Sequence, residues 1–284
     1  MMLVILQILS ILQLLSVVSS SSWCYDETQN DGPFHWYTHY ENCDDNNQSP
    51  INIVNAIEDD DLEGFRFRNY EVTNGVMEIL KNDGHSAKLT CSGVQMTLTG
   101  GDLGETFIFE QLHFHWGHDD SLGSEHTVNG MAYPMEMHLV HYASSYGSFA
   151  NAVDKPNGLA VLGFFFQISE FDNPNLQNLV DALDVIPNTD ETATVAPFSI
   201  YDLIAYGLGP YYRYYGSLTT PPCYESVIWT VFARTIPISS SQMSHFRTLF
   251  DDHAHVLEDN FRPTQPLNSR SVYYYAGDDD SSSS

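Results

Sequence analysis

The sequence predicts a single α+β domain, mostly β, built on a large, central, twisted β-sheet. The sheet is expected to be mixed but mainly antiparallel, with short helices at its periphery. Short apolar segments follow one another along residues 23–276, and most are separated by turn residues such as Asn74-Gly75 and Asn157-Gly158. Segments with helical spacing are few. The 284 residues contain no internal Gly/Ser linker, which favours one large domain with a substantial core.

The expected strands are short and lie between turn signals. They are Val76–Leu80, Lys88–Thr90, Gln95–Thr99, Thr106–Trp116, Tyr133–Tyr142, Leu159–Ile168, Ser199–Ile204, Tyr211–Gly216 and Val227–Thr235. The segment Leu159–Ile168 is nearly continuous in apolar residues, which predicts a strand buried on both faces.

Two helices are expected beside this sheet. In Asn173–Leu183 the apolar residues have helical spacing, and Ser239–Phe250 begins with residues that cap helices. The apolar faces consist of Leu176, Leu179, Val180 and Leu183 in the first segment and of Met243, Phe246, Leu249 and Phe250 in the second.

The two ends of the chain differ from the domain between them. Residues 1–22 hold no charged side chain, are rich in Leu, Ile and Val, and end in serines, which predicts a secretory signal peptide and a secreted, extracellular protein. A membrane anchor is the alternative, since the run is near the lower length limit for a span. No later segment is apolar enough to cross a membrane. Residues 277–284 are acidic and rich in serine, and we expect them to be disordered.

The chain is strongly acidic, with a formal net charge of −27. It contains only 10 Lys and Arg residues, so binding to nucleic acid or to anionic membranes is disfavoured, because both require basic patches. The simplest consequence of the acidity is solubility in an extracellular fluid. Loose Ca²⁺ binding or adaptation to high salt is a sharper alternative.

The four cysteines are Cys24, Cys43, Cys91 and Cys223. In a secreted protein at least one disulfide is expected, but four cysteines allow three full pairings and their spacing does not choose among them. The oligomeric state is likewise open.

Three histidines have the spacing of a metal site. His113 and His115 are two residues apart in a predicted strand, so their side chains share one face while Phe114 points to the other. A neighbouring strand could bring His138 to the same point. Three neutral imidazoles and one water form the four-coordinate zinc site with an open position that is typical of catalysis rather than of structure.

A metal-binding histidine usually donates its second ring N–H to a fixed acceptor. Gln111 shares the strand face of His113, and Glu136 shares that of His138, so both are candidate acceptors. His115 has no such side chain two residues away, which leaves a backbone carbonyl as the default. A hydroxyl paired with a carboxylate could then orient the nucleophile, and Thr219, Thr220 and Glu125 offer these groups.

Several spaced motifs, in order, resemble those of the α-class carbonic anhydrases from Trp23 to about Arg270. They are Gln48-Ser-Pro-Ile-Asn-Ile53, Leu112-His-Phe-His-Trp-Gly117, Gly123-Ser-Glu-His-Thr-Val128, Glu136-Met-His-Leu-Val-His141, Ser217-Leu-Thr-Thr-Pro-Pro222 and Arg262-Pro-Thr-Gln-Pro266. The resemblance implies a zinc enzyme that hydrates carbon dioxide reversibly to bicarbonate and a proton, by attack of zinc-bound hydroxide.

The resemblance also implies residue roles. His113, His115 and His138 correspond to the zinc ligands, Thr219 to the hydroxyl that orients the nucleophile, and Glu125 to the acceptor of that hydroxyl.

Further positions correspond to residues around this centre. Gln111 and Glu136 match acceptors for the ligand histidines, the carbonyl of Asn260 would serve His115, and Thr220 matches a residue beside departing bicarbonate. The apolar wall for carbon dioxide corresponds to Val140, Val161, Leu218, Val227 and Trp229. Such a wall suits an uncharged gas. Cys43 and Cys223 match a disulfide of secreted members, whereas the match does not settle Cys24 and Cys91.

Each turnover must also export a proton, and a histidine has a suitable pKa near neutral pH. His85 corresponds to the family's proton shuttle, and Tyr25 and Asn82 to polar residues that hold its water chain. Asp83 and Lys88 depart from the amides often found at their positions. A carboxylate near His85 should raise its pKa and an ammonium should lower it, which leaves the net effect open.

Two other functions compete with the enzyme. A family member that has become a binding module should lack a zinc ligand, but this chain has all three together with Thr219, Glu125 and His85. An acidic matrix protein that associates with Ca²⁺ or mineral is compatible with catalysis, and the net charge of −27 motivates it. A secondary esterase activity is also expected.

Overall fold

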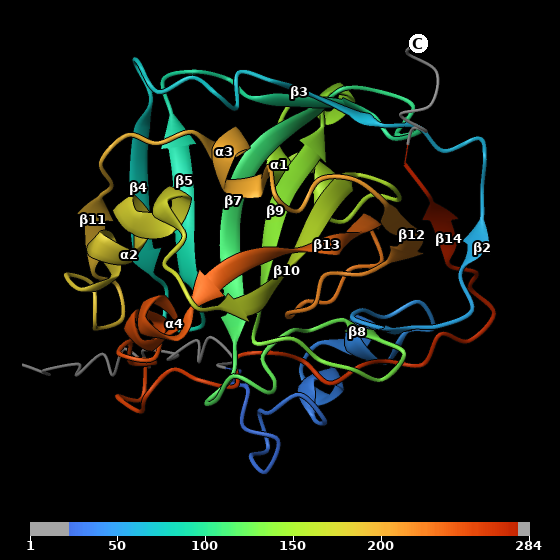
Figure 1. Cartoon of the computed structure of the whole chain (residues 1–284). Helices are drawn as coiled ribbons and strands as arrows, with labels where there is room; N and C mark the ends of the chain where they lie inside the picture. The colour runs from blue at the N-terminus through green and yellow to red at the C-terminus, as the bar shows by residue number, and fades with distance from the viewer. Residues whose placement is uncertain (1–22, 278–284) are drawn as a thin grey trace, which may run out of the picture.

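A large twisted sheet dominates the computed structural model, which describes residues 23–277 (Figure 1). The signal peptide expected at residues 1–22 and nearly all of the tail expected at 277–284 lie outside these residues. The main path of the sheet runs through β11 (Thr192–Thr194), β4 (Met77–Asn82), β5 (Ala87–Ser92), β7 (Phe107–Trp116), β9 (Met135–Ala143), β10 (Leu159–Ser169), β13 (Val227–Ser239), β12 (Tyr211–Gly216), β14 (Tyr273–Tyr275) and β2 (Ile57–Glu58).

Two further strands lie beside that path. β6 (Thr97–Gly100) pairs with β7 and with β3 (Phe65–Arg68). Within the described residues, the pairs β10/β13 and β14/β2 of this sheet are parallel and its other pairs are antiparallel. The predicted mixed, mainly antiparallel sheet is therefore confirmed. A separate parallel pair joins β1 (Asn52–Ile53) to β8 (Thr127–Val128).

Most predicted strands are present, with shifted ends, but the strand predicted at Ser199–Ile204 is wrong. This segment forms helix α3 (Ile200–Ile204). The Ser199 hydroxyl caps the helix by accepting the N–H of Asp202 at 3.0 Å, and Ile200, Leu203 and Ile204 are buried. The segment is rich in residues that favour strands, but the cap and the burial of positions i, i+3 and i+4 stabilise a helix instead.

The helices are short and lie around the sheet (Figure 1). The α-helices are α1 (Phe149–Ala152), α2 (Gln177–Leu183), α3 and α4 (Ser240–Phe246), and the 3₁₀ helices are η1 (Trp36–Thr38), η2 (Glu41–Asp44), η3 (Ser144–Tyr146) and η4 (Pro174–Leu176). The predicted segment Asn173–Leu183 forms η4 and α2. Helix α4 begins after a capping box of Ser239 and Gln242 and ends at Phe246, short of the predicted Phe250.

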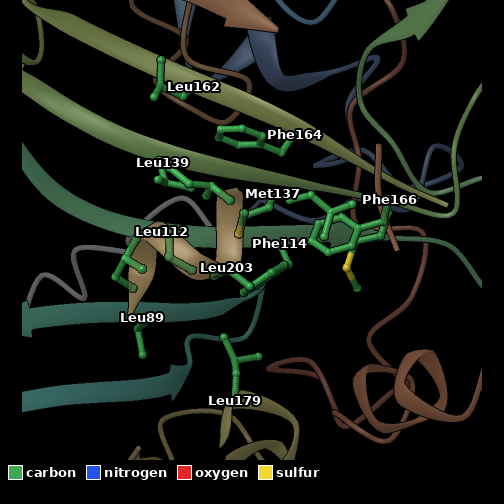
Figure 2. Packing of buried hydrophobic residues seen from close by; sticks show 14 of the residues in the cluster. Leu89, Leu112, Phe114, Met137, Leu139, Leu162, Phe164, Phe166, Leu179 and Leu203 are labelled. Atoms are coloured by element: carbon green, nitrogen blue, oxygen red, sulfur yellow. The ribbon is translucent and has the colours of Figure 1, made fainter. Parts of the chain in front are cut away.

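The two faces of the central strands serve different purposes. Figure 2 shows that side chains from β5, β7, β9 and β10 pack together with side chains from α2 and α3. The labelled residues are Leu89, Leu112, Phe114, Met137, Leu139, Leu162, Phe164, Phe166, Leu179 and Leu203, and all are fully buried. Because strand side chains alternate, His113 and His115 project from the face opposite to this core. Burial of the core thereby fixes the direction of both histidines.

Candidate metal centre and active site

Strands β7 and β9 bring the three predicted ligands together. They pair antiparallel, with His113 opposite His138 and His115 opposite Glu136. One nitrogen from each of the three imidazoles lies within 4.8 Å of the others. The Nε2 atom of His115 and the Nδ1 atom of His138 are 3.1 Å apart. The predicted triad thus forms one cluster of nitrogen atoms.

In each ring, the nitrogen outside this cluster donates a hydrogen bond to a fixed acceptor. His113 Nδ1 donates to Oε1 of Gln111 at 2.9 Å, His115 Nδ1 to the carbonyl of Asn260 at 2.7 Å, and His138 Nε2 to Oε1 of Glu136 at 2.7 Å. Since these oxygens accept, we assign the ring protons to the nitrogens that face them. The remaining nitrogens carry lone pairs directed at a common centre.

Burial favours the neutral form of all three rings. It lowers the pKa of His113 well below its usual value and also lowers the pKa values of His115 and His138. Two lone pairs that face each other at 3.1 Å repel unless a cation lies between them. Three neutral nitrogen donors are the ligand set of a catalytic zinc site, so these residues fit a zinc ion.

Glu136 orients two histidines at once. Its Oε1 atom also accepts from His126 Nδ1 at 2.7 Å, and its Oε2 atom accepts from the backbone N–H of His126 at 2.8 Å. The other nitrogen of His126 bonds the Tyr214 hydroxyl at 2.7 Å. Burial opposes ionisation of Glu136, but His126 and His138 hold its pKa well below the usual value. Glu136 is therefore a buried carboxylate beside the cluster.

His126 follows Glu125 in the sequence, and its internal hydrogen-bond partner is Glu136. The two chain segments meet only when β9 lies beside the 123–128 segment, which the sequence spacing does not reveal. Both side chains are fully buried. His126 and Tyr214 are thus residues of the site that no local pattern in the sequence indicates.

Glu125 lies next to the triad, and Thr219 lies beside Glu125. Both are buried, and Glu125 Oε1 accepts the N–H of Arg262 at 2.9 Å. Its Oε2 atom lies 3.4 Å from His115 Nε2. Burial raises the pKa of Glu125, while His115, the Arg262 N–H and a hydrogen bond with Thr219 oppose this rise. The structure therefore places the predicted hydroxyl and carboxylate beside each other and beside a ligand.

An apolar cluster adjoins the same face. Val161 pairs with Val140 on one side and with Trp229 on the other. The predicted wall residues Val140, Val161, Val227 and Trp229 are buried in this cluster, and Leu218 packs against it. Thr220 is half-buried, and its carbonyl accepts the N–H of Cys223 at 2.9 Å. Because Leu218 packs against the wall, the wall continues into residues 217–223, which we call the Thr219 loop.

His85 lies apart from the triad. Its ring stacks on Trp23 with centroids 3.9 Å apart and meets Tyr25 edge-on at 6.4 Å. A cavity of about 660 Å³ is lined by His85 and Tyr25 but by none of the three ligand histidines. Burial lowers the pKa of His85, whereas Asp83 and two other carboxylates oppose this.

Asn82 has a different environment from the one expected. It is fully buried, and its amide donates to the carbonyls of Pro187 at 3.1 Å and Phe250 at 2.9 Å. Its Oδ1 atom accepts the N–H of Gly84 at 3.0 Å. The Asn82 side chain thus anchors the turn that carries His85, and these backbone bonds occupy the amide that was expected to hold water.

The predicted disulfide is confirmed. Cys43 and Cys223 are bonded, across a sequence separation of 180. Gln48 donates to the carbonyl of Cys223 at 3.2 Å, and Arg262 donates to the carbonyl of Cys43 at 3.0 Å. Cys24 and Cys91 are free thiols, so they do not pair with each other.

Comparison with known proteins agrees with this geometry. The sequence pattern of the family described as eukaryotic-type carbonic anhydrase matches residues 31–276. Carbonic anhydrase 7 of Mus musculus is 38% identical over 258 residues, which cover 88% of this chain and 96% of the mouse protein. Carbonic anhydrase 6 of Homo sapiens is 36% identical over 259 residues, which cover 89% of this chain and 82% of the human protein. Carbonic anhydrase 7 of Homo sapiens is 38% identical over a similar span.

Proposed function

Because the chain belongs to the eukaryotic-type carbonic anhydrase family, we propose that it hydrates carbon dioxide with a zinc ion held by His113, His115 and His138. The observation that carries the proposal is the cluster of three imidazole nitrogens within 4.8 Å of one another, from the buried His115 and His138 and the half-buried His113. When bound, zinc supplies the charge that makes water nucleophilic near neutral pH, a role for which carbonic anhydrase is the standard example.

Thr219 would orient the nucleophile by donating its hydroxyl proton to Glu125. A hydroxyl whose proton is donated to a carboxylate has only its oxygen lone pairs left for other partners. Thr219 would therefore accept from an O–H group at the centre and would disfavour ligands that carry no proton. Arg262 holds the acceptor by donating its N–H to Glu125 Oε1 at 2.9 Å.

The apolar wall would receive carbon dioxide. Val140, Val161 and Trp229 bury their side chains around this face, where a weakly polar gas displaces little bound water. Thr220 lies at the edge of the wall, where it would contact departing bicarbonate.

His85 would export the proton. A histidine whose burial and neighbouring carboxylates have opposing effects on its pKa can exchange protons near neutral pH. Tyr25 lies beside its ring and would help to order water on the path to the cavity.

Zinc dependence can be tested by stopped-flow hydration of carbon dioxide, with and without a chelator. We expect the chelator to abolish hydration and zinc to restore it. His115→Ala should lower both the zinc content and the rate by at least about 100-fold, because it removes a ligand from a three-ligand site. His39→Ala, at an exposed histidine, is the control. Wild-type hydration that is insensitive to the chelator would refute the mechanism.

The shuttle can be tested separately. His85→Ala should lower the hydration rate about 10-fold or more in weak buffer, because general acid–base transfer contributes at least that much. Added imidazole should restore the rate by carrying the proton itself. A rate in weak buffer that equals the wild-type rate would reject the role of His85.

We further propose that the protein is secreted. The Cys43–Cys223 disulfide favours an oxidising compartment, and residues 1–22 have the composition of a signal peptide. In residues 23–277 no helix has the length and apolar character needed to span a membrane. Recovery of a processed chain from the medium of expressing cells tests this proposal, and retention of an unprocessed chain in the cells contradicts it.

A further inference from the structure

Besides Asn82, the carboxylate of Asp83 holds the turn that carries His85. Oδ1 of Asp83 accepts the backbone N–H of His85 at 3.2 Å and that of Ser86 at 2.9 Å. Oδ2 of the same residue accepts from Nζ of Lys88 at 2.6 Å. One oxygen of Asp83 thus fixes the turn, while an ammonium fixes the other oxygen.

The same turn is bonded to the strand that carries two of the proposed ligands. Ser86 Oγ donates to the carbonyl of Phe114 at 2.6 Å, between His113 and His115. The Asn260 side chain donates to the carbonyl of His85 at 2.9 Å, while the Asn260 carbonyl accepts from His115. The turn is therefore bonded to β7, and the bonds to Asp83 fix the backbone conformation of His85 within it.

Lys88 projects from the sheet face that carries the triad. It is the register partner of His113 across β5 and β7. The Lys88 and Asp83 side chains are 35% and 22% exposed, whereas those of the pair Lys155–Asp154 are 47% and 45% exposed. The Asp83–Lys88 pair is thus the more sheltered of the two and is less screened by salt.

The two members of the pair act on His85 with opposite sign. Asp83 raises the pKa of His85 and Lys88 lowers it, while burial lowers it most. The other groups that face this ring are Asp251 and Asp252 from the segment after helix α4, which raise its pKa, and Tyr25 and Trp23 from the N-terminal segment.

We propose that the Asp83–Lys88 ion pair is a positioning device for the proton carrier. Asp83 fixes the backbone of His85, and Lys88 holds Asp83 in place and balances its charge. His85 is thereby fixed relative to β7, and Lys88 offsets the effect of Asp83 on its ring. The inference rests on the proposed shuttle role of His85, and it assigns a purpose to both Asp83 and Lys88.

The direct test is NMR titration of the His85 ring in the zinc-loaded protein, with the signal assigned by His85→Ala. Lys88→Met should raise the titration midpoint by a few tenths of a pH unit, and Asp83→Asn should lower it by a similar amount. Asparagine keeps the Oδ1 acceptor, so the turn should persist. The double variant should return towards the wild-type midpoint. Lys155→Met makes the same charge change at a distant ion pair and should leave the midpoint unchanged.

Hydration rates in weak buffer complete the test. The pH profile of each single variant should move in the direction of its NMR midpoint, and imidazole should rescue any lost rate. Midpoints that stay fixed, or that move in the same direction in both single variants, overturn the role of the ion pair even where His85→Ala is impaired and rescued. An unchanged rate in His85→Ala overturns the shuttle, and this proposal with it.

Discussion

At the scale of single residues, the centre depends on how tightly Glu136 is held. One carboxylate accepts the ring protons of both His126 and His138, and a third bond comes from the backbone of His126. Every one of these contacts is buried. Glu136 therefore has little freedom to move, and any group that displaces it must also displace a proposed ligand.

Gly163 provides the most specific test of this arrangement. It lies opposite His138 on the neighbouring strand β10, and a Cβ atom there would lie 3.0 Å from Glu136 Oε1 and 3.8 Å from His138 Cδ2. Because Glu136 cannot yield without losing hydrogen bonds, Gly163→Ala should lower zinc affinity by about 10-fold. Competition with a fluorescent chelator measures this, with metal-free thermal unfolding as the control for general destabilisation. Unaltered competition would show that the carboxylate adjusts freely.

At the scale of elements, the Thr219 loop is braced from outside the sheet. The disulfide joins the end of this loop to helix η2, and Arg262 ties the same region to Glu125. The loop itself has little regular structure, so these cross-links supply the rigidity that strands would otherwise provide.

Replacing both Cys43 and Cys223 by serine should lower the free energy of unfolding by about 2–5 kcal/mol, because the bond closes a loop of 180 residues and restricts the unfolded chain. Urea unfolding of the oxidised wild type and the variant measures the difference. Cys24→Ser removes a free thiol and should change the free energy of unfolding far less. Equal losses in the two variants would show that cysteine packing, rather than the cross-link, accounts for the effect.

Local patterns predict the strands and their faces well, because alternation is a local property of the backbone. The placement of Gln111 and His113 on one face follows from their spacing alone. The segment Ser199–Ile204 fails because it is too short for its composition to distinguish a strand from a helix, so its cap and tertiary burial decide.

Contacts between distant segments require more than local pattern. The carbonyl that serves His115 comes from Asn260, 145 residues away, and only the family resemblance predicts it. The Cys43–Cys223 pairing also follows from the resemblance, since spacing allows three alternatives. The bond between His126 and Glu136 follows from neither, because a buried histidine near several carboxylates has more than one plausible partner.

At the scale of the whole molecule, charge makes stability depend on pH. The chain carries a net charge of −27, and self-repulsion opposes the compact state. Glu78 adds a buried carboxyl on β4, where neither carboxyl oxygen has a hydrogen-bond partner, and burial raises its pKa from 4.5 to about 7.

The sign of the Glu78 effect follows from its two ionisation states. Below pH 4.5 the carboxyl is protonated in the folded and unfolded chains alike, so it does not lower the free energy of unfolding. Between about 4.5 and 7 the unfolded chain ionises first, and stability falls as pH rises. Above about pH 7 the cost is constant, at up to about 3 kcal/mol for a difference of roughly 2.5 pKa units. Glu78→Gln removes this cost, so the variant should gain stability over the wild type as pH rises from 5 to 8.

Urea unfolding of both proteins at pH 5 and pH 8 measures that gain. Glu58→Gln makes the same change in net charge on an exposed strand, and it separates relief of overall repulsion from relief of burial. If the Glu78 and Glu58 variants gain equally, net charge rather than the buried carboxyl governs the pH dependence. If the Glu78 variant alone gains, the fold of this acidic protein carries a carboxyl in its core whose ionisation destabilises the fold near neutral pH.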